Sequence, residues 1–197
     1  MPVRWLVLLA VGLLAAYRFA TDRPVDWRPG VLVDSEPEQS PTDADALERE
    51  GFSVLPQARF NAEVRVLSRE RYRFDPLAEV APLDLAVGWG PLSDTAVLED
   101  LRIWQSGRFF HWRARELPLP IDVIDSHLSN WHLVPANDAA WRQLQRIRVG
   151  DVVTITGLLV DLESAGTGRI RTSLTRADRG AGACEIVWVD SVAFRYR

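Results

Sequence analysis

The residues best suited to chemistry are Cys184 and His132, because the chain holds only one Cys and three His. A thiolate and an imidazole form a nucleophile pair when they meet, and a third group then orients the imidazole ring. Asp178 and Asn130 are the two candidates for that third group. The competing interpretation is that Cys184 is a small buried hydrophobic residue and His132 a structural histidine bonded to the backbone.

A larger set of polar residues lies at expected strand ends and in loops, and it predicts a ligand-binding site. In an extended strand Asn130 and His132 project from one face, and an amide oxygen can fix the tautomer of an imidazole. Backbone N–H groups of residues 176–183 could hold an oxyanion or a carboxylate. The alternative is a buried polar network that fixes the loops. The predicted ligand-binding residues are Trp89, Asp94, Gln105, Arg108, Asn130, His132, Arg176, Asp178 and Glu185.

Residue types and spacing exclude several other classes of chemistry. All 23 Lys+Arg residues are Arg, which excludes Schiff-base chemistry and the lysines of P-loop and kinase sites. A single Cys excludes a disulfide within the chain and a CxxC redox pair. No potential ligand shows the spacing of a known metal motif, so we predict no metal and no cofactor. The side chains considered as ligands are His111, His127, His132, Asp125 and Glu185.

The elements that must position these residues follow a period of two from Gly51 onward, which is typical of half-buried strands. Ser106-Gly107 predicts a hairpin turn, and residues 117–126 are expected to be a proline-punctuated connection. Two short helices are predicted, one after Ser93 and one after Asn137. The predicted fold is mainly β (β-rich α+β), a small closed or partly open β-barrel with two short helices, because closure removes sheet edges.

The N-terminal region has the composition of a membrane anchor. Residues 5–17 are an unbroken apolar run between Arg4 and Arg18. The run spans about 20 Å as a helix against a hydrocarbon core of roughly 30 Å, and the flanking Arg side chains can extend it by snorkelling. The small-residue pair that signal peptidase requires is missing. We therefore expect an uncleaved membrane helix over residues 1–20, held in the lipid bilayer through residues 4–18, then an acidic tether over 21–50 and a globular domain over 51–197.

Charge bears on orientation and on partners. Arg18, Arg23 and Arg28 after the apolar run favour a cytoplasmic domain, whereas the signal-like layout favours export. We expect the periplasmic side of a bacterial inner membrane. Beyond residue 20, 21 basic residues face 27 acidic ones, a balance of −6, so we expect no nucleic-acid partner.

Two resemblances add to these predictions. Residues 147–160, with Gly157 inside a strand, resemble a strand of OB-fold modules. The segments DLAVGWGPLSD, SNWHLVP, IRVGDVVTITGLLV and SLTRADRGAGACE resemble those of uncharacterised, membrane-anchored bacterial proteins that have no established activity. The sequence therefore predicts a membrane-anchored periplasmic binding or scaffolding module, with an envelope protein as a candidate partner. The alternative is a hydrolase or transferase that uses Cys184 with His132.

Overall fold

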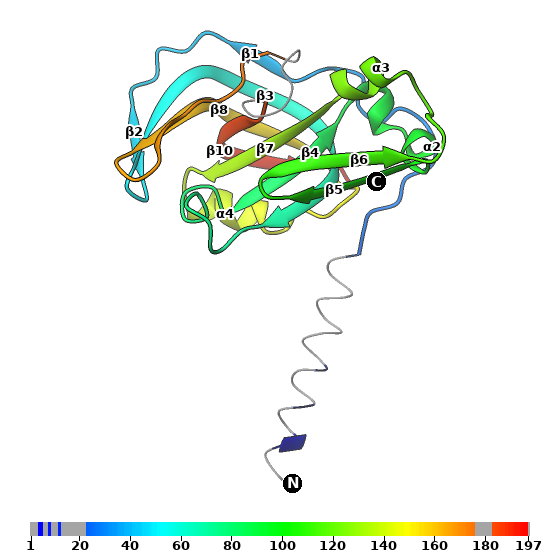
Figure 1. Cartoon of the computed structure of the whole chain (residues 1–197), viewed down its shortest axis with the longest axis horizontal. Coiled ribbons are helices and arrows are strands. Elements are labelled where there is room, and N and C mark those ends of the chain that lie inside the picture. Colours follow the sequence, from blue (N-terminus) through cyan, green and yellow to red (C-terminus); the bar gives the residue numbers. More distant parts are fainter. Residues whose placement is uncertain (1–3, 6–7, 9–11, 13–22, 176–182, 197) are drawn as a thin grey trace.

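The computed structural model describes residues 4–5, 8, 12, 23–175 and 183–196, so the expected anchor lies almost entirely outside the described residues. Strands dominate the described part of the chain, in one eight-stranded sheet and one two-stranded sheet (Figure 1). The strands are β1 Glu38–Ser40, β2 Leu47–Arg49, β3 Phe52–Arg71, β4 Leu83–Gly88, β5 Leu101–Ser106, β6 Phe109–Ala114, β7 Leu128–Pro135, β8 Val152–Ser164, β9 Gly168–Ile170 and β10 Glu185–Phe194. The helices are the 3-10 turn η1 Gly90–Ser93, α2 Thr95–Leu98, α3 Ile121–Ser126 and α4 Asp138–Leu144.

Five strands of the larger sheet close a ring. β3 pairs antiparallel with both β4 and β8, β4 pairs with β7, and β10 lies between β7 and β8. β7 and β10 run parallel, and the other pairs in the ring are antiparallel. The mainly β fold predicted from the alternating pattern is thereby confirmed. Each ring strand has a partner on both sides, which removes the exposed edges that invite aggregation.

Alternate residues of the ring strands face the main hydrophobic core. Leu83, Leu85 and Val87 of β4 lie in the same buried cluster as Trp131 and Leu133 of β7. The intervening residues of β4 and β7 therefore point to the opposite face of the sheet, because side chains alternate along a strand. That opposite face of β4 and β7 is where the polar site forms.

The hairpin of β5 and β6 lies over the outer face of the ring near β4 and β7 (Figure 1). Leu101 of β5 packs with Leu92, Ile124 and Leu128 in a separate apolar cluster beneath it. The expected hairpin is present, but its two-residue loop is Gly107-Arg108, one position later than the predicted Ser106-Gly107, because Ser106 still pairs with Phe109. Both loop residues have left-handed φ angles, +59° at Gly107 and +73° at Arg108. Two such residues in a two-residue hairpin loop match the twist of the strands.

Residues 23–50 differ from the expected solvated tether, because they pack on the domain. β1 and β2 both pair with β3, and the Val25 N–H donates to the Val149 carbonyl at 2.8 Å. Gly150, with φ of +88°, permits this approach, since a Cβ there would lie 2.0 Å from the Val25 carbonyl oxygen. The acidic composition of this segment predicted that it is exposed, and its side chains are indeed largely exposed. The pairing of its backbone with β3 could not be predicted, because composition does not reveal backbone hydrogen bonds.

The helix prediction also needs correction. The sequence predicted two short helices, whereas the described residues contain three besides the 3-10 turn, because 121–126 forms α3. Pro120 stands at its N-cap, and Ile124 is fully buried in the cluster beneath the hairpin. A six-residue helix is too short to show a helical period, so only the prolines were visible in the sequence. Within the described part of the chain, no helix combines the length and apolarity needed to span a bilayer.

Gly157 offers a test of the ring closure. A Cβ at this position would lie 1.8 Å from the backbone carbonyl oxygen of Trp188 in β10, so one of two paired strands must shift. We expect Gly157→Ala to lower the free energy of unfolding by at least about 2 kcal/mol in urea denaturation. The matched control is Gly166→Ala, where no atom lies within 4 Å and the change should stay within about 0.5 kcal/mol. Equal stabilities of the two variants would contradict the pairing of β8 with β10.

Candidate functional site

Three neighbouring segments of the sheet bring an acid, an imidazole and a thiol together. Asp84 of β4 stands directly opposite His132 of β7 in the antiparallel ladder. Cys184 immediately precedes β10, whose residues Glu185 and Ile186 pair with Trp131 and His132. β7 therefore lies between the strand that carries the acid and the strand that follows the thiol.

His132 is held between the other two side chains. Its Nδ1 atom lies 2.9 Å from Asp84 Oδ2, and neither atom has another partner among the described residues. The Cys184 side chain lies close enough to the ring to raise the pKa of His132. Because Asp84 occupies Nδ1, Nε2 is the ring nitrogen that remains for the sulfur. This is the sequence of contacts that defines a nucleophile, a base and an orienting acid.

Asp84 is fully buried and has a second cationic partner. Arg108 Nη1 lies 2.8 Å from Asp84 Oδ1, and Arg108 Nη2 lies 2.7 Å from Asp75 Oδ1. The Arg108 guanidinium also stacks on the Tyr72 ring, 3.8 Å from the ring centroid. The backbone N–H of Arg108 donates to the Tyr72 hydroxyl. Since a buried carboxylate is strongly unfavourable without such partners, Arg108 fixes Asp84 rather than presenting a free cation to a ligand.

Asn130 and Gln105 complete the surroundings of the sulfur. Asn130 Nδ2 lies 3.1 Å from the Arg108 carbonyl oxygen, which can only accept, so this contact fixes the orientation of the Asn130 amide. Gln105 Nε2 then donates to Asn130 Oδ1 at 2.7 Å. Asn130 Nδ2 is also 3.6 Å from Cys184 Sγ, and thus supplies a donor to a thiolate. Cys184 itself is half-buried.

The environment of His132 changes its protonation. Burial lowers the pKa of the imidazole, but the hydrogen bonds and charges of Asp84 and Cys184 outweigh burial and raise the pKa to about 9. His132 is therefore an imidazolium at neutral pH, beside a carboxylate on one side and a thiol group on the other.

Five of the predicted site residues come together at this place: Cys184, His132, Asn130, Gln105 and Arg108. Their grouping matches the predicted polar site, although Arg108 and Gln105 bind protein groups. The third group beside the Cys–His pair differs from both predicted candidates, because Asp84 orients His132 while Asn130 contacts the sulfur. Asp178, the other candidate, lies outside the described residues, as does Arg176.

Three predicted residues lie elsewhere. Trp89 is part of the main core, and Asp94 caps α2 by accepting from the Ala96 N–H. Glu185 follows Cys184 but points to the inner face, where its carboxylate accepts from the Ser129 hydroxyl. These positions were chosen as polar or aromatic residues near strand ends, and that criterion does not reveal which face of the sheet they occupy.

Sequence reasoning missed Asp84, Asp75 and Tyr72. For Asp84 one local signal exists, because it is the single charged residue in the strand LDLAVG and shares its face with the small residues Ala86 and Gly88. Its partners Arg108 and His132 could not be identified locally, since they lie 24 and 48 positions further along the chain.

The remaining histidines are engaged separately from His132. His111 lies 3.0 Å from the Ser106 hydroxyl on the hairpin, and His127 Nδ1 lies 2.8 Å from the Val123 carbonyl oxygen. Over the described ranges, no three His, Cys, Asp or Glu side chains are grouped so that they could hold a metal ion.

Comparison of the chain with protein-family models, with curated proteins and with solved structures finds no match. The geometry of Asp84, His132, Asn130 and Cys184 is therefore the basis for assigning a function.

The raised pKa of His132 predicts a pH-dependent stability. The folded-state pKa of about 9 lies above the ordinary value of 6.5, so the stabilisation is complete below about pH 6.5 and is lost as the pH rises through 9. We expect the free energy of unfolding to fall by on the order of 3 kcal/mol between these limits relative to His132→Gln. Urea denaturation over pH 6–9.5 measures this difference.

Two further variants serve as controls for that experiment. His111→Gln, on the exposed hairpin face, should leave the pH dependence unchanged. Asp84→Asn removes the carboxylate, so burial then dominates and the NMR titration of the His132 ring should move well below pH 9. Parallel pH curves for the wild type and His132→Gln would contradict the assigned charge state.

Proposed function

We propose that the protein is a membrane-anchored thiol enzyme that transfers or hydrolyses an acyl group, with Cys184 as the nucleophile. The observation that carries this proposal is the position of His132, between the Asp84 carboxylate and the Cys184 side chain. In this assignment His132 is the general acid and base, and Asp84 holds the ring in the tautomer that directs Nε2 at the sulfur. Asn130 supplies an N–H donor beside the sulfur.

The proposed reaction has two steps. The Cys184 thiolate attacks the carbonyl carbon of an ester, thioester or amide; a C–S bond forms, the bond to the leaving group breaks, and the leaving group takes the proton of His132. Neutral His132 then accepts a proton from water or another acceptor nucleophile, which attacks the thioester. The C–S bond breaks, the acyl group leaves with the acceptor, and the imidazolium–thiolate pair is restored.

We further propose an OB-like barrel for the domain. Support comes from the five-stranded ring with one parallel pair and from the position of Gly157, where β8 approaches β10. A five-stranded, partly open barrel is the architecture of OB-folds. A bend at a barrel corner is a common place for a strand glycine.

The location proposed for this domain is the periplasmic side of a bacterial inner membrane, with residues 1–20 as the anchor. The apolar run 5–17 between Arg4 and Arg18 supports the anchor. An anchored acyl-transfer enzyme would meet acyl substrates at or near the bilayer, including those that are themselves bound to lipid or envelope protein.

Reactivity of Cys184 tests the proposed enzyme directly. With iodoacetamide at pH 7, we expect Cys184 of the wild type to be alkylated at least about tenfold faster than in His132→Gln, because the imidazolium favours the thiolate. With p-nitrophenyl acetate, we expect an acetyl adduct on Cys184 that accumulates and then turns over, detected by mass spectrometry of the intact chain. His111→Gln is the matched control, since it replaces an exposed histidine and should leave both rates unchanged.

Two results would overturn the assignment. One is equal alkylation rates in the wild type and His132→Gln, with both variants shown to be folded by circular dichroism. The other is release of p-nitrophenolate that persists in Cys184→Ala, since the thiol would then not be the nucleophile. Cys184→Ser tests the same point with a side chain of similar size.

A second candidate function is a binding or scaffolding module, favoured by a groove on another side of the ring. The groove has a volume of about 890 Å³ and lies between β1, β3 and β8, with Phe60 and Gly157 among its lining residues. An extended segment of an envelope protein would suit such a groove. The two functions can be separated by complementation in cells whose own copy of the protein is deleted. A binding module predicts that the Cys184→Ser variant restores growth and that Asn61→Arg, in the groove wall, does not. A thiol enzyme predicts that the Cys184→Ser variant does not restore growth.

A further inference from the structure

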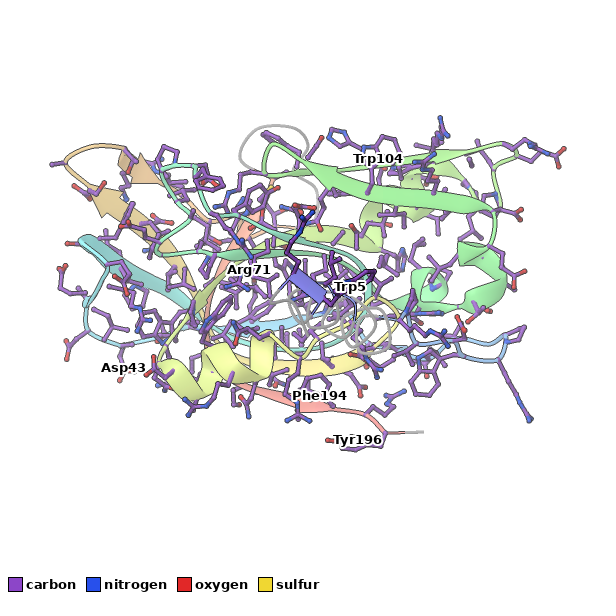
Figure 2. The ribbon with its side chains drawn as sticks, turned by 90° about the horizontal axis from the view of Figure 1, so that it is seen from below. Trp5, Asp43, Arg71, Trp104, Phe194 and Tyr196 are labelled. Carbon is purple, nitrogen blue, oxygen red and sulfur yellow. The ribbon has the colours of Figure 1, made fainter. Side chains whose placement is uncertain are left out.

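Arginines and aromatic rings gather on the side of the domain where the N-terminal segment joins it. Figure 2 views the domain from this side and shows Arg71, Phe194 and Tyr196. We call this surface the underside patch, and it consists of Arg69, Arg71, Trp141, Arg142, Arg146, Phe194 and Tyr196.

Contacts among these residues make the patch one continuous surface. The Arg71 guanidinium lies 5.1 Å from the centroid of the Trp141 ring, and the Arg146 guanidinium lies 5.4 Å from that of Phe194. Arg69 Nη2 reaches the Gln145 carbonyl oxygen at 3.4 Å. The end of β3, helix α4 with the loop after it, and the end of β10 therefore share this surface.

The patch is positively charged although the whole chain carries a net charge of −4. Arg71, Arg142 and Arg146 are exposed, and no carboxylate of the described residues lies within ion-pair distance of them. Nearby Arg148 and Arg195, by contrast, are paired with Asp151 and Glu63. Three unneutralised guanidinium groups on one face of an acidic domain indicate a surface suited to anions.

The patch also lies where the chain enters the domain. The Val25 N–H donates to the carbonyl of Val149, only three residues beyond Arg146. Tyr17 ends the apolar run, and Val25 stands eight positions further along, which is at most about 28 Å of extended chain. A bilayer that holds residues 4–18 must therefore lie within this reach of Val149 and of the patch beside it.

We infer that the underside patch docks the domain onto the anionic phospholipid headgroups of the bilayer that holds the anchor. Guanidinium groups bind phosphate in a bidentate manner, and each one near a charged membrane surface contributes several-fold to binding. The rings of Trp141 and Tyr196 suit the membrane–water interface. This inference rests on the proposed anchor, and it is independent of the thiol chemistry.

The test uses the full chain in nanodiscs of phosphatidylcholine, with and without phosphatidylglycerol. Hydrogen exchange is measured for the backbone amides of residues 138–150 and 69–73. We expect slower exchange with phosphatidylglycerol, and we expect the triple variant Arg71→Gln, Arg142→Gln, Arg146→Gln to abolish the difference. At roughly fivefold per arginine, the triple variant should lower the docked-to-undocked ratio by about 100-fold.

Two control variants isolate the patch from net charge and from loss of packing. Arg59→Gln, Arg113→Gln, Arg115→Gln removes the same charge from other exposed positions and should retain the protection. Replacing Arg71, Arg142 and Arg146 with Lys keeps the positive charge and should retain most of the protection from hydrogen exchange. Identical exchange in both lipids, or protection that survives the triple Gln variant, would overturn the docking.

Washing the same discs with 1 M salt separates this inference from the anchor. Retention of the chain on both lipids supports the anchor, and the exchange data then decide on the patch. A second outcome is that 1 M salt releases the chain, that at low salt the chain binds only discs with phosphatidylglycerol, and that the triple Gln variant loses this binding. In that case the anchor is wrong and docking through the patch is supported. A chain that binds neither lipid would overturn both proposals.

Discussion

The buried carboxylate of Asp84 is the constraint on which the site depends. Its side chain has no exposed surface, and an isolated buried charge would cost several kcal/mol. Two cations from different elements offset that cost, Arg108 from the hairpin turn and His132 from β7. The hairpin must therefore lie with its turn over β4 and β7, and the left-handed φ of Arg108 is held by contacts that this placement creates.

From this pairing follows a line of alternating charge that crosses the domain. Asp75, Arg108, Asp84 and His132 each contact the next, and their charges run negative, positive, negative, positive, with the Cys184 side chain beside His132 at the end. Both ends of the line are partly exposed, and its centre is fully buried. The charges of Asp75, Arg108, Asp84 and His132 sum to zero, and the orientation of His132 is determined by Asp84 rather than by solvent.

Local sequence pattern was enough for the strands and for part of the site. Alternation predicted the strands around residues 58–66 and 83–89, and Ser106-Gly107 predicted the hairpin, because burial of one face imposes a period of two. The rarity of Cys and His directed attention to Cys184 and His132. Asp84 was not predicted, since its role depends on the pairing of β4 with β7, which are separated by residues 89–127 of the chain.

Composition was a poor guide where backbone pairing decides the structure. Residues 34–50 are acidic and largely exposed, yet two three-residue strands within this stretch, β1 and β2, pair with β3. The polar residues Asp94 and Glu185 were grouped with the site because a single sequence does not show which residues share a face across strands. The membrane anchor and the cellular location remain predictions from the apolar run and its flanking arginines.

The parallel pairing of β7 with β10 has a consequence for how the site is assembled during synthesis. Asp84, Arg108 and His132 all emerge from the ribosome well before Cys184, which arrives with the strand that completes the ring. A nascent chain can thus pair Asp84 with His132 before it contains the thiol. Cys184 joins this pair only as β10 closes the ring, so the complete site and the closed fold arise in one event.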